Sequence, residues 1–84
     1  METLGSLVDK LTIANIRIWM AEDRKRDPHA TDFGIAQATR VAQDTNIIRN
    51  QLMEEIDELF VDVVSGKKKM ELYKQGSTKM YGKE

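Results

Sequence analysis

The sequence contains no cysteine, a single proline and no long hydrophobic run. Without cysteine, the chain can form neither a disulfide framework nor a thiolate metal site. No stretch of about 18 apolar residues occurs, so we expect no membrane-spanning helix. The first residues include Glu2 and Asp9 and lack the basic and then apolar pattern of a signal peptide. These absences together predict a cytoplasmic protein.

The residue types that carry most enzyme chemistry are also scarce. The one histidine, His29, lies beside Pro28, and a histidine in such a position is ordinarily solvated. No Cys/His/Asp cluster has zinc-binding spacing, and no glycine-rich phosphate loop occurs. No general base that could activate a nucleophile is indicated near Ser6, Ser65 or Ser77. The sequence therefore predicts no catalytic residue.

The net charge of −1 conceals two oppositely charged parts. Residues 1–65 contain 7 Lys or Arg and 12 Asp or Glu, whereas residues 66–84 contain 6 Lys and 2 Glu. The basic tail, residues 67–84, can be simply solvated, can bind the acidic body of another copy, or can contact a phosphate. We do not expect nucleic-acid binding, because the acidic body repels a phosphate backbone and the tail has no arginine.

What the sequence does contain is helical periodicity. The 34 residues from Asp32 to Ser65 include no proline, and their one glycine, Gly34, lies in the first turn. Apolar residues recur at helical spacing: Ala38, Val41, Ile48, Leu52, Ile56, Leu59 and Val63. This spacing predicts one helix over about 32–65, roughly 50 Å long at about 1.5 Å per residue.

A second helical pattern precedes it, over about residues 3–25. Its main apolar stripe is Leu4, Leu7, Val8, Leu11, Ala14, Ile18 and Trp19. Pro28 predicts a turn over 26–31, and Gly66 predicts the end of the long helix. The sequence thus predicts that residues 1–66 form an all-α antiparallel hairpin whose second helix is long. In the tail we expect a brief helix around 69–74.

The hairpin predicts self-association. In an antiparallel hairpin with this turn, residues that face each other have numbers that sum to about 57, so Leu4 lies opposite Met53. Residues beyond about Glu55 then have no partner in their own hairpin. The first helix is also apolar on a second side, which indicates further neighbours. We therefore expect a dimer that forms a four-helix bundle, and next a domain-swapped or higher oligomer. The expected interface residues are Ile13, Ile16, Met20, Ile56, Leu59, Phe60 and Val63.

Several polar residues interrupt or flank the apolar stripes. Together with the only tryptophan, they are Asn15, Trp19, Glu22, Thr45, Asn46 and Arg49. Buried polar groups need partners, and Asn15 is expected to bond Thr45 or Asn46. The set can form a polar layer that fixes the helix register. Alternatively, it forms a small pocket in which Arg49 binds a carboxylate or phosphate, or it is simply exposed.

These positions also resemble a known family. The elements, in order, are Leu11-x-x-x-Asn15, Trp19-x-x-Glu22-Asp23, Asn46-x-x-Arg49-Asn50-x-Leu52 and Glu55-Ile56-Asp57. They resemble a family of small bacterial helical proteins known as a domain of unknown function, over about residues 7–64. Family members carry a histidine after the tryptophan, whereas this chain has Met20. The resemblance implies an all-helical fold and no established activity.

A second resemblance is local. Residues 52–59, Leu-Met-Glu-Glu-Ile-Asp-Glu-Leu, resemble the first metal-binding helix of the MazG-type all-α nucleotide pyrophosphohydrolases. That resemblance implies a Mg²⁺-dependent enzyme with Glu55 and Glu58 as metal ligands. The second acidic pair of that family, spaced Glu-x-x-Asp on a later helix, is missing here. The same acidic residues can also form the solvated face of a helix.

The best interpretation of the sequence is a small cytosolic helical protein that self-associates and works as a binding or assembly module. Its expected partners are a second copy and, in addition, another protein, with no membrane and no cofactor. The alternative is a Mg²⁺-dependent enzyme similar to the all-α nucleotide pyrophosphohydrolases.

Overall fold

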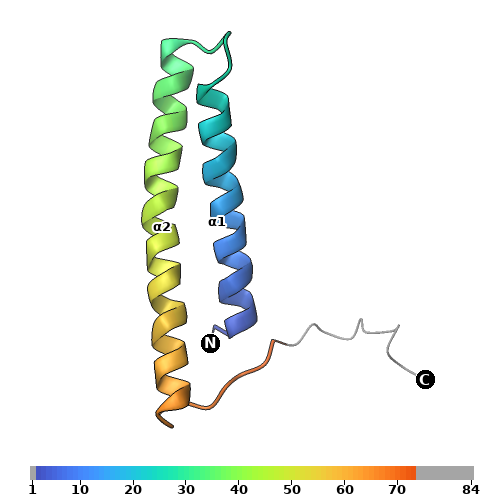
Figure 1. Ribbon diagram of the computed structural model, residues 1–84, viewed down its shortest axis with the longest axis vertical. Coiled ribbons are helices and arrows are strands. Elements are labelled where there is room, and N and C mark those ends of the chain that lie inside the picture. The colour runs from blue at the N-terminus through green and yellow to red at the C-terminus, as the bar shows by residue number, and fades with distance from the viewer. Residues whose placement is uncertain (1, 74–84) are drawn as a thin grey trace, which may run out of the picture.

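The computed structural model describes residues 2–73 and forms an antiparallel hairpin of two helices (Figure 1). Helix α1 spans Leu4–Lys25 and helix α2 spans Asp32–Val64. Residues 2–73 contain no β-strand, so the predicted all-α class is confirmed. Neither helix in this part of the chain combines the length and apolarity needed to cross a bilayer.

Side chains of threonine start both helices. Thr3 accepts a hydrogen bond from the Ser6 amide at 3.1 Å, and the Thr3 amide donates to Ser6 Oγ at 3.2 Å. This reciprocal capping box satisfies two of the backbone donors that a helix start leaves free. At the start of α2, Thr31 accepts from the amide of Gly34 at 3.0 Å. The start of each helix is therefore fixed by local chemistry.

The end of α2 is equally local. Gly66 has a φ of +83°, which a residue without a Cβ adopts at little cost. The amide of Gly66 donates to the Val63 carbonyl at 3.1 Å, and the amide of Lys67 donates to the Asp62 carbonyl at 2.9 Å. This pair of bonds is the Schellman motif that ends helices at glycine.

The brief helix expected around 69–74 does not form over Lys69–Tyr73. Residue 74 lies outside the described residues. The physical reason is that a helix of one or two turns must meet the cost of nucleation without an apolar face to pack. Most of these residues are charged or lie exposed, so tertiary contacts do not offset that cost.

The buried side chains recur every seven residues on both helices. On α1 they are Leu7, Ala14 and Ala21, and on α2 they include Ala38, Thr45, Leu52 and Leu59. A strict seven-residue repeat is the signature of a coiled-coil seam between two helices. The seam divides into a leucine cluster at the open end of the hairpin and an alanine cluster, Ala21, Ala38 and Ala42, near the turn.

The register differs from the predicted one. Leu7 shares its cluster with Leu52 and Leu59, and Ile56 and Val63 pack against that cluster. The prediction that these three residues beyond Glu55 have no partner in their own hairpin is therefore wrong. Figure 1 gives the reason, because α2 extends past α1 at both ends and its extra length is shared between them.

The ends of α2 remain uncovered by α1. At the turn end, Phe33 is 73% exposed. At the open end, Phe60 and Val64 are 66% and 69% exposed. The expectation of an unsheltered apolar end therefore applies to Phe60 and Val64 and not to Leu59, which is buried.

Candidate functional site

A polar contact bridges the two helices halfway along the seam. The Nε group of Arg49 donates a hydrogen bond to Oδ1 of Asn15 at 2.7 Å. Arg49 lies seven residues before the seam residue Ile56, so its half-buried side chain emerges beside the apolar core. Asn15 therefore bonds Arg49, and not Thr45 or Asn46 as expected from the sequence.

The other members of the predicted polar set do not gather at this contact. Thr45 is buried in the seam, whereas Asn46 is exposed and Trp19 is 62% exposed. Glu22 pairs with Lys25 on its own helix, with Nζ and Oε1 3.2 Å apart. The structure thus places a single polar contact, and no enclosed polar pocket, at this level of the hairpin.

The contribution of this contact can be measured with a double-mutant cycle. We expect Asn15→Ala and Arg49→Ala to show a coupling energy of about 0.5–1 kcal/mol in the free energy of unfolding. The bond involves a charged donor, but solvent screens it because it lies at the surface. Chemical denaturation of the two single variants and the double variant measures the coupling, and strictly additive effects would contradict it.

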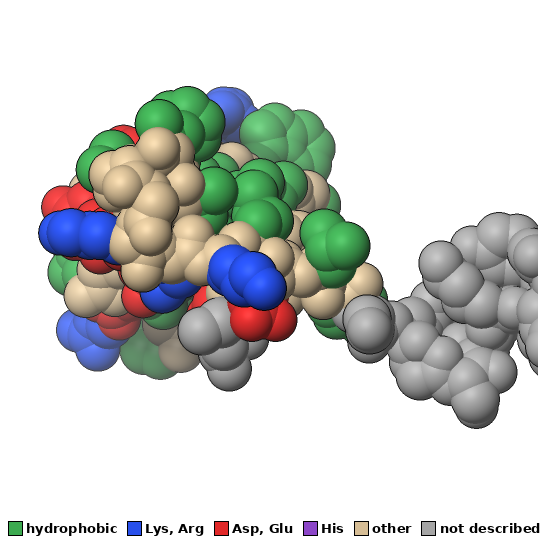
Figure 2. Space-filling view, turned by 90° about the horizontal axis from the view of Figure 1, so that it is seen from below, with side chains coloured by type: hydrophobic (Ala, Val, Ile, Leu, Met, Phe, Trp, Pro, Cys, Tyr) green, Lys and Arg blue, Asp and Glu red, His purple; other side chains and the backbone are tan. Residues whose placement is uncertain are grey.

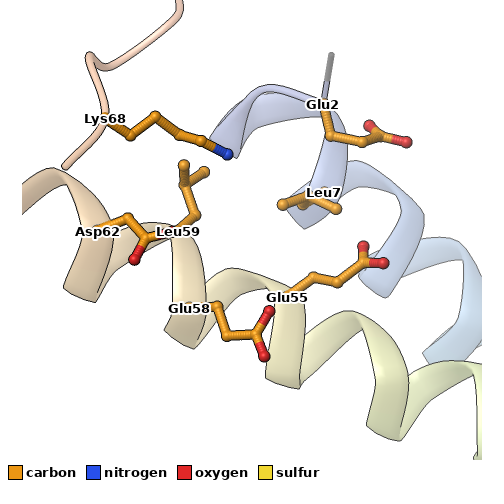
Figure 3. Close-up of a pocket in the computed structure, with 7 residues that line it drawn as sticks. All are labelled: Glu2, Leu7, Glu55, Glu58, Leu59, Asp62 and Lys68. Atoms are coloured by element: carbon orange, nitrogen blue, oxygen red, sulfur yellow. The ribbon is translucent and has the colours of Figure 1, made fainter.

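A pocket of about 380 Å³ lies at the open end of the hairpin (Figure 3). Leu7 and Leu59 form its apolar lining, and the remaining lining residues are Glu2, Glu55, Glu58, Asp62 and Lys68. The side chain of Lys68 extends across the pocket toward the start of α1 (Figure 3). The pocket therefore combines a small apolar lining with a strongly acidic rim and one cation.

One carboxylate of this rim is engaged in a local ion pair. Glu2 accepts hydrogen bonds from Lys10 and from the hydroxyl of Ser6. The hydrogen bond from Lys10, followed by the bond from Ser6, lowers the pKa of Glu2, and the same pair raises the pKa of Lys10. The pKa of Glu2 is lower in the folded chain than in the unfolded chain. The ion pair therefore stabilises the fold at pH values above the unfolded pKa. The benefit is lost as the pH falls through the folded pKa.

The acidic side chains do not converge on a common point. Within residues 2–73, no group of three or more histidine, cysteine, aspartate or glutamate side chains could hold a metal ion. Glu55 and Glu58 both line the pocket, but no third ligand joins them there. A two-carboxylate site would have to take its remaining ligands from water or from a substrate.

Two adjoining grooves with largely apolar linings lie outside the seam. One lies between the helices and brings together Ile13, Arg17, Ile48 and Glu55 among its lining residues. The other lies along α1 and is lined by Ile13, Ile16, Arg17, Met20 and Arg24. The two grooves share Ile13 and Arg17, so they form one continuous surface.

We call this surface the isoleucine face. It consists of Lys10, Ile13, Arg17, Met20 and Arg24 of α1 and Ile48 and Glu55 of α2, which line the grooves, together with Val41 and Asp44, which helical spacing places on the same side of α2. Members of each helix are three, four or seven residues apart, which places them on one side of that helix. Ile13, Met20 and Ile48 are each about half exposed.

Of the predicted interface residues, the structure places only Ile13 and Met20 on this face. Ile16 lies at its edge, in the groove along α1. Ile56, Leu59 and Val63 belong to the seam, and Phe60 is exposed at the open end. Sequence reasoning placed Ile48 in the apolar stripe of α2 and missed it as a surface partner of Ile13, with which it lines the groove between the helices.

The hairpin leaves part of its apolar surface uncovered. Figure 2, seen from below, shows hydrophobic side chains exposed beside acidic and basic ones at the open end of the hairpin. Fifteen large hydrophobic side chains among the described residues are exposed, whereas the large side chains buried there are three leucines. The hairpin therefore leaves most of its large apolar side chains exposed to solvent.

Comparison with known proteins places the chain in a family without naming an activity. Neither the curated proteins nor the solved structures include a significant match. A family model described as a protein of unknown function, DUF4254, matches residues 6–79. This match covers most of the chain, including the Asn15–Arg49 contact, the open-end pocket and the isoleucine face. The chain therefore belongs to the DUF4254 family of proteins of unknown function.

Proposed function

We propose that this protein is a self-associating helical module of the cytosol, which forms a homodimeric four-helix bundle and acts in binding or assembly. The observation that carries the proposal is the imbalance of its core. Leu7, Leu52 and Leu59 are the large side chains buried within the described hairpin, and the other buried apolar residues are alanines. Two helices form a single layer, and stable domains pack at least two layers around a core.

The energetics point the same way. Each large apolar side chain transferred from water into a core stabilises a protein by about 1.5–3 kcal/mol. Small cores rarely supply more than about 3–5 kcal/mol of net stability. A core with three buried leucines is small, so the hairpin alone has little net stability. Packing a second hairpin against the first would bury several of the exposed isoleucine, methionine and valine side chains and add the missing layer.

Exposed aromatic residues support the binding part of the proposal. Trp19 is 62% exposed, and Phe33 and Phe60 are exposed at opposite ends of α2. Tryptophan and phenylalanine are enriched at the centres of protein interfaces, because they bury much area with few torsions to fix. These side chains offer contact points for a further protein once the dimer has formed.

Light scattering over a range of protein concentrations tests the proposal. We expect a mass of twice 9.6 kDa at micromolar concentration and a melting temperature that rises with protein concentration. The rise follows from mass action, because dimer dissociation is coupled to unfolding. A monomeric mass at every concentration, together with cooperative unfolding at a constant temperature, would show that the hairpin is stable alone and would overturn the proposal.

A further inference from the structure

We infer that the second copy binds the isoleucine face, and that the two hairpins lie with their turns at the same end, so that α1 of each copy packs antiparallel against α2 of the other. This inference rests on the proposed dimerisation and adds to it the surface used and the symmetry. It depends on three features of the face, which are its size, its apolar centre and its division into a basic and an acidic half.

The size of the face matches a stable interface. Helix α1 has 22 residues and is therefore about 33 Å long, and two helices side by side are about 20 Å wide. The projected area is then roughly 660 Å² before surface relief is counted. Stable interfaces bury about 800 Å² per partner. A second hairpin laid along this face would thus bury about the area that such a dimer requires.

The centre of the face is apolar. Ile13 and Met20 of α1 lie seven residues apart, as do Val41 and Ile48 of α2. Ile13 and Ile48 line the same groove between the helices. A partner seated here would cover the half-exposed isoleucines directly.

The opposite face of the hairpin also exposes apolar side chains, Trp19 among them, but it carries uncharged polar groups that a second copy would have to satisfy. It contains the Asn15–Arg49 contact and, on α2, a polar series of Gln43, Asn46 and Asn50. Burying these groups against an identical surface would leave amides in need of new partners, each costing about 1–3 kcal/mol when unmet. The isoleucine face also contains charged groups, among them Arg17, which lines both grooves, and these can pair with opposite charges of a second copy.

The charges of the isoleucine face differ between its two helices. On α1 the charged residues are Lys10, Arg17 and Arg24, which recur every seven residues. On α2 they are Asp44 and Glu55. Lys10 is paired with Glu2, whereas Arg17 and Arg24 form no ion pair within residues 2–73. The face is therefore basic along α1 and acidic along α2.

Two twofold arrangements can bring this face against itself. If the twofold axis runs along the helices, both turns lie at the same end and α1 covers the partner's α2. If the axis runs across the helices, the turns lie at opposite ends, α1 covers the partner's α1 and α2 covers the partner's α2. The first arrangement places basic residues on acidic residues, and the second places like charges together. Since like charges facing each other across an interface oppose binding, the first is favoured.

The levels of the charged residues agree with the first arrangement. Ala14 belongs to the cluster of Leu52, and Ala21 belongs to the cluster of Ala38 and Ala42. Along the helix axis, Arg17 lies between Ala14 and Ala21. It is therefore beside the part of α2 between Ala42 and Leu52, which contains Asp44 and Ile48. An axis along the helices keeps the same level in the partner, so Arg17 would meet the partner's Asp44.

Single-cysteine variants test the arrangement, because the natural sequence has no cysteine. The exposed turn residue His29 is replaced in His29→Cys, and Ser65, just after α2, is replaced in Ser65→Cys as the matched variant at the open end. Both are spin-labelled, and the distance between labels is measured in the full-length dimer after light scattering has given its mass. With the turns together, His29→Cys labels lie across the bundle, within about 20 Å. With the turns apart, they are separated by at least the length of α1, about 33 Å.

Each outcome is decisive. Short distances in both single variants, and a long distance in a mixed dimer of His29→Cys with Ser65→Cys, are expected. A dimeric mass with long distances in the single variants, and a short distance in the mixed dimer, would overturn the inference but leave the proposed function intact. A monomeric mass would overturn both.

Two further readouts test the surface itself. We expect Arg17→Glu to raise the dissociation constant about tenfold, and the double variant Arg17→Glu/Asp44→Arg to restore it, since the swap recreates opposite charges. An unchanged dissociation constant for Arg17→Glu would contradict this pairing. Trp19 lies on α1 away from Ile13, so its fluorescence emission should stay unchanged when the dimer is diluted to monomers. A shift of that emission would place the interface on the opposite face.

Discussion

Replacing Leu59 with alanine should lower the free energy of unfolding by about 2–5 kcal/mol. Leu59 is 8% exposed and lies in the cluster that joins Leu7 of α1 to Leu52 of α2. Its truncation removes apolar contacts and leaves a cavity that two stiff helices can close only in part. Urea denaturation at two protein concentrations measures the loss and separates folding from association.

The matched control for Leu59→Ala is Val61→Ala. Val61 lies two residues away on the same helix and is 59% exposed, so its truncation should change stability by less than about 0.5 kcal/mol. Combining Leu59→Ala with Leu7→Ala should give a non-additive loss, because both side chains occupy one cluster. Full additivity would show that Leu59 finds its shelter elsewhere, as the register predicted from the sequence would require.

Enlarging Ala21 should also be costly, for the opposite reason. Ala21 and Ala38 are both 0% exposed and pack against each other, with Ala42, where the helices meet near the turn. In Ala21→Leu, three additional carbon atoms must fit into a seam with no free space, which typically costs about 1–3 kcal/mol. Leucine and alanine are both good helix formers, so the loss reports on packing between the helices and not on helix propensity.

Thermal unfolding monitored by circular dichroism measures this effect. The control is Ala36→Leu, which makes the same chemical change at an exposed position of α2 and should leave the melting temperature within a few degrees. If Ala21→Leu unfolds at the same temperature as the natural protein, the alanine cluster is not a close contact and the seam described here is incorrect near the turn.

The helices themselves were predictable because their signals are local. Thr3, Thr31 and Gly66 act within a few residues along the chain, through side-chain caps and a left-handed backbone conformation. Pro28 lies in the turn for a comparably local reason. The family resemblance predicted from elements between Leu11 and Asp57 is likewise confirmed, since the family model covers them all.

The candidate site was predictable only in part. The sequence indicated that Asn15 and Arg49 interrupt the apolar stripes, but not that they bond each other, because that pairing depends on the register of the two helices. The same register decides that α1 reaches far enough to bury Leu59, whereas Phe60 is exposed because it points about 100° away around the helix. Periodicity alone assigns a residue to a side of its own helix and does not say how far the neighbouring helix reaches.

The sequence by itself determined that this chain forms two helices, where they begin and end, and how charge is distributed along them. Only the tertiary structure decided how the extra length of α2 is shared between the two ends of the hairpin. It also decided that alanines occupy the seam near the turn and leucines occupy it at the open end, while Ile13 and Ile48 lie outside it, half exposed. The physical reason is how far apart the interacting residues lie in the sequence. Caps and turns are set by hydrogen bonds between near neighbours in the chain. Register is set by many weak contacts between side chains far apart in the chain, from Ala21 with Ala38 near the turn to Leu7 with Leu59 at the open end, and only the folded hairpin brings these contacts together.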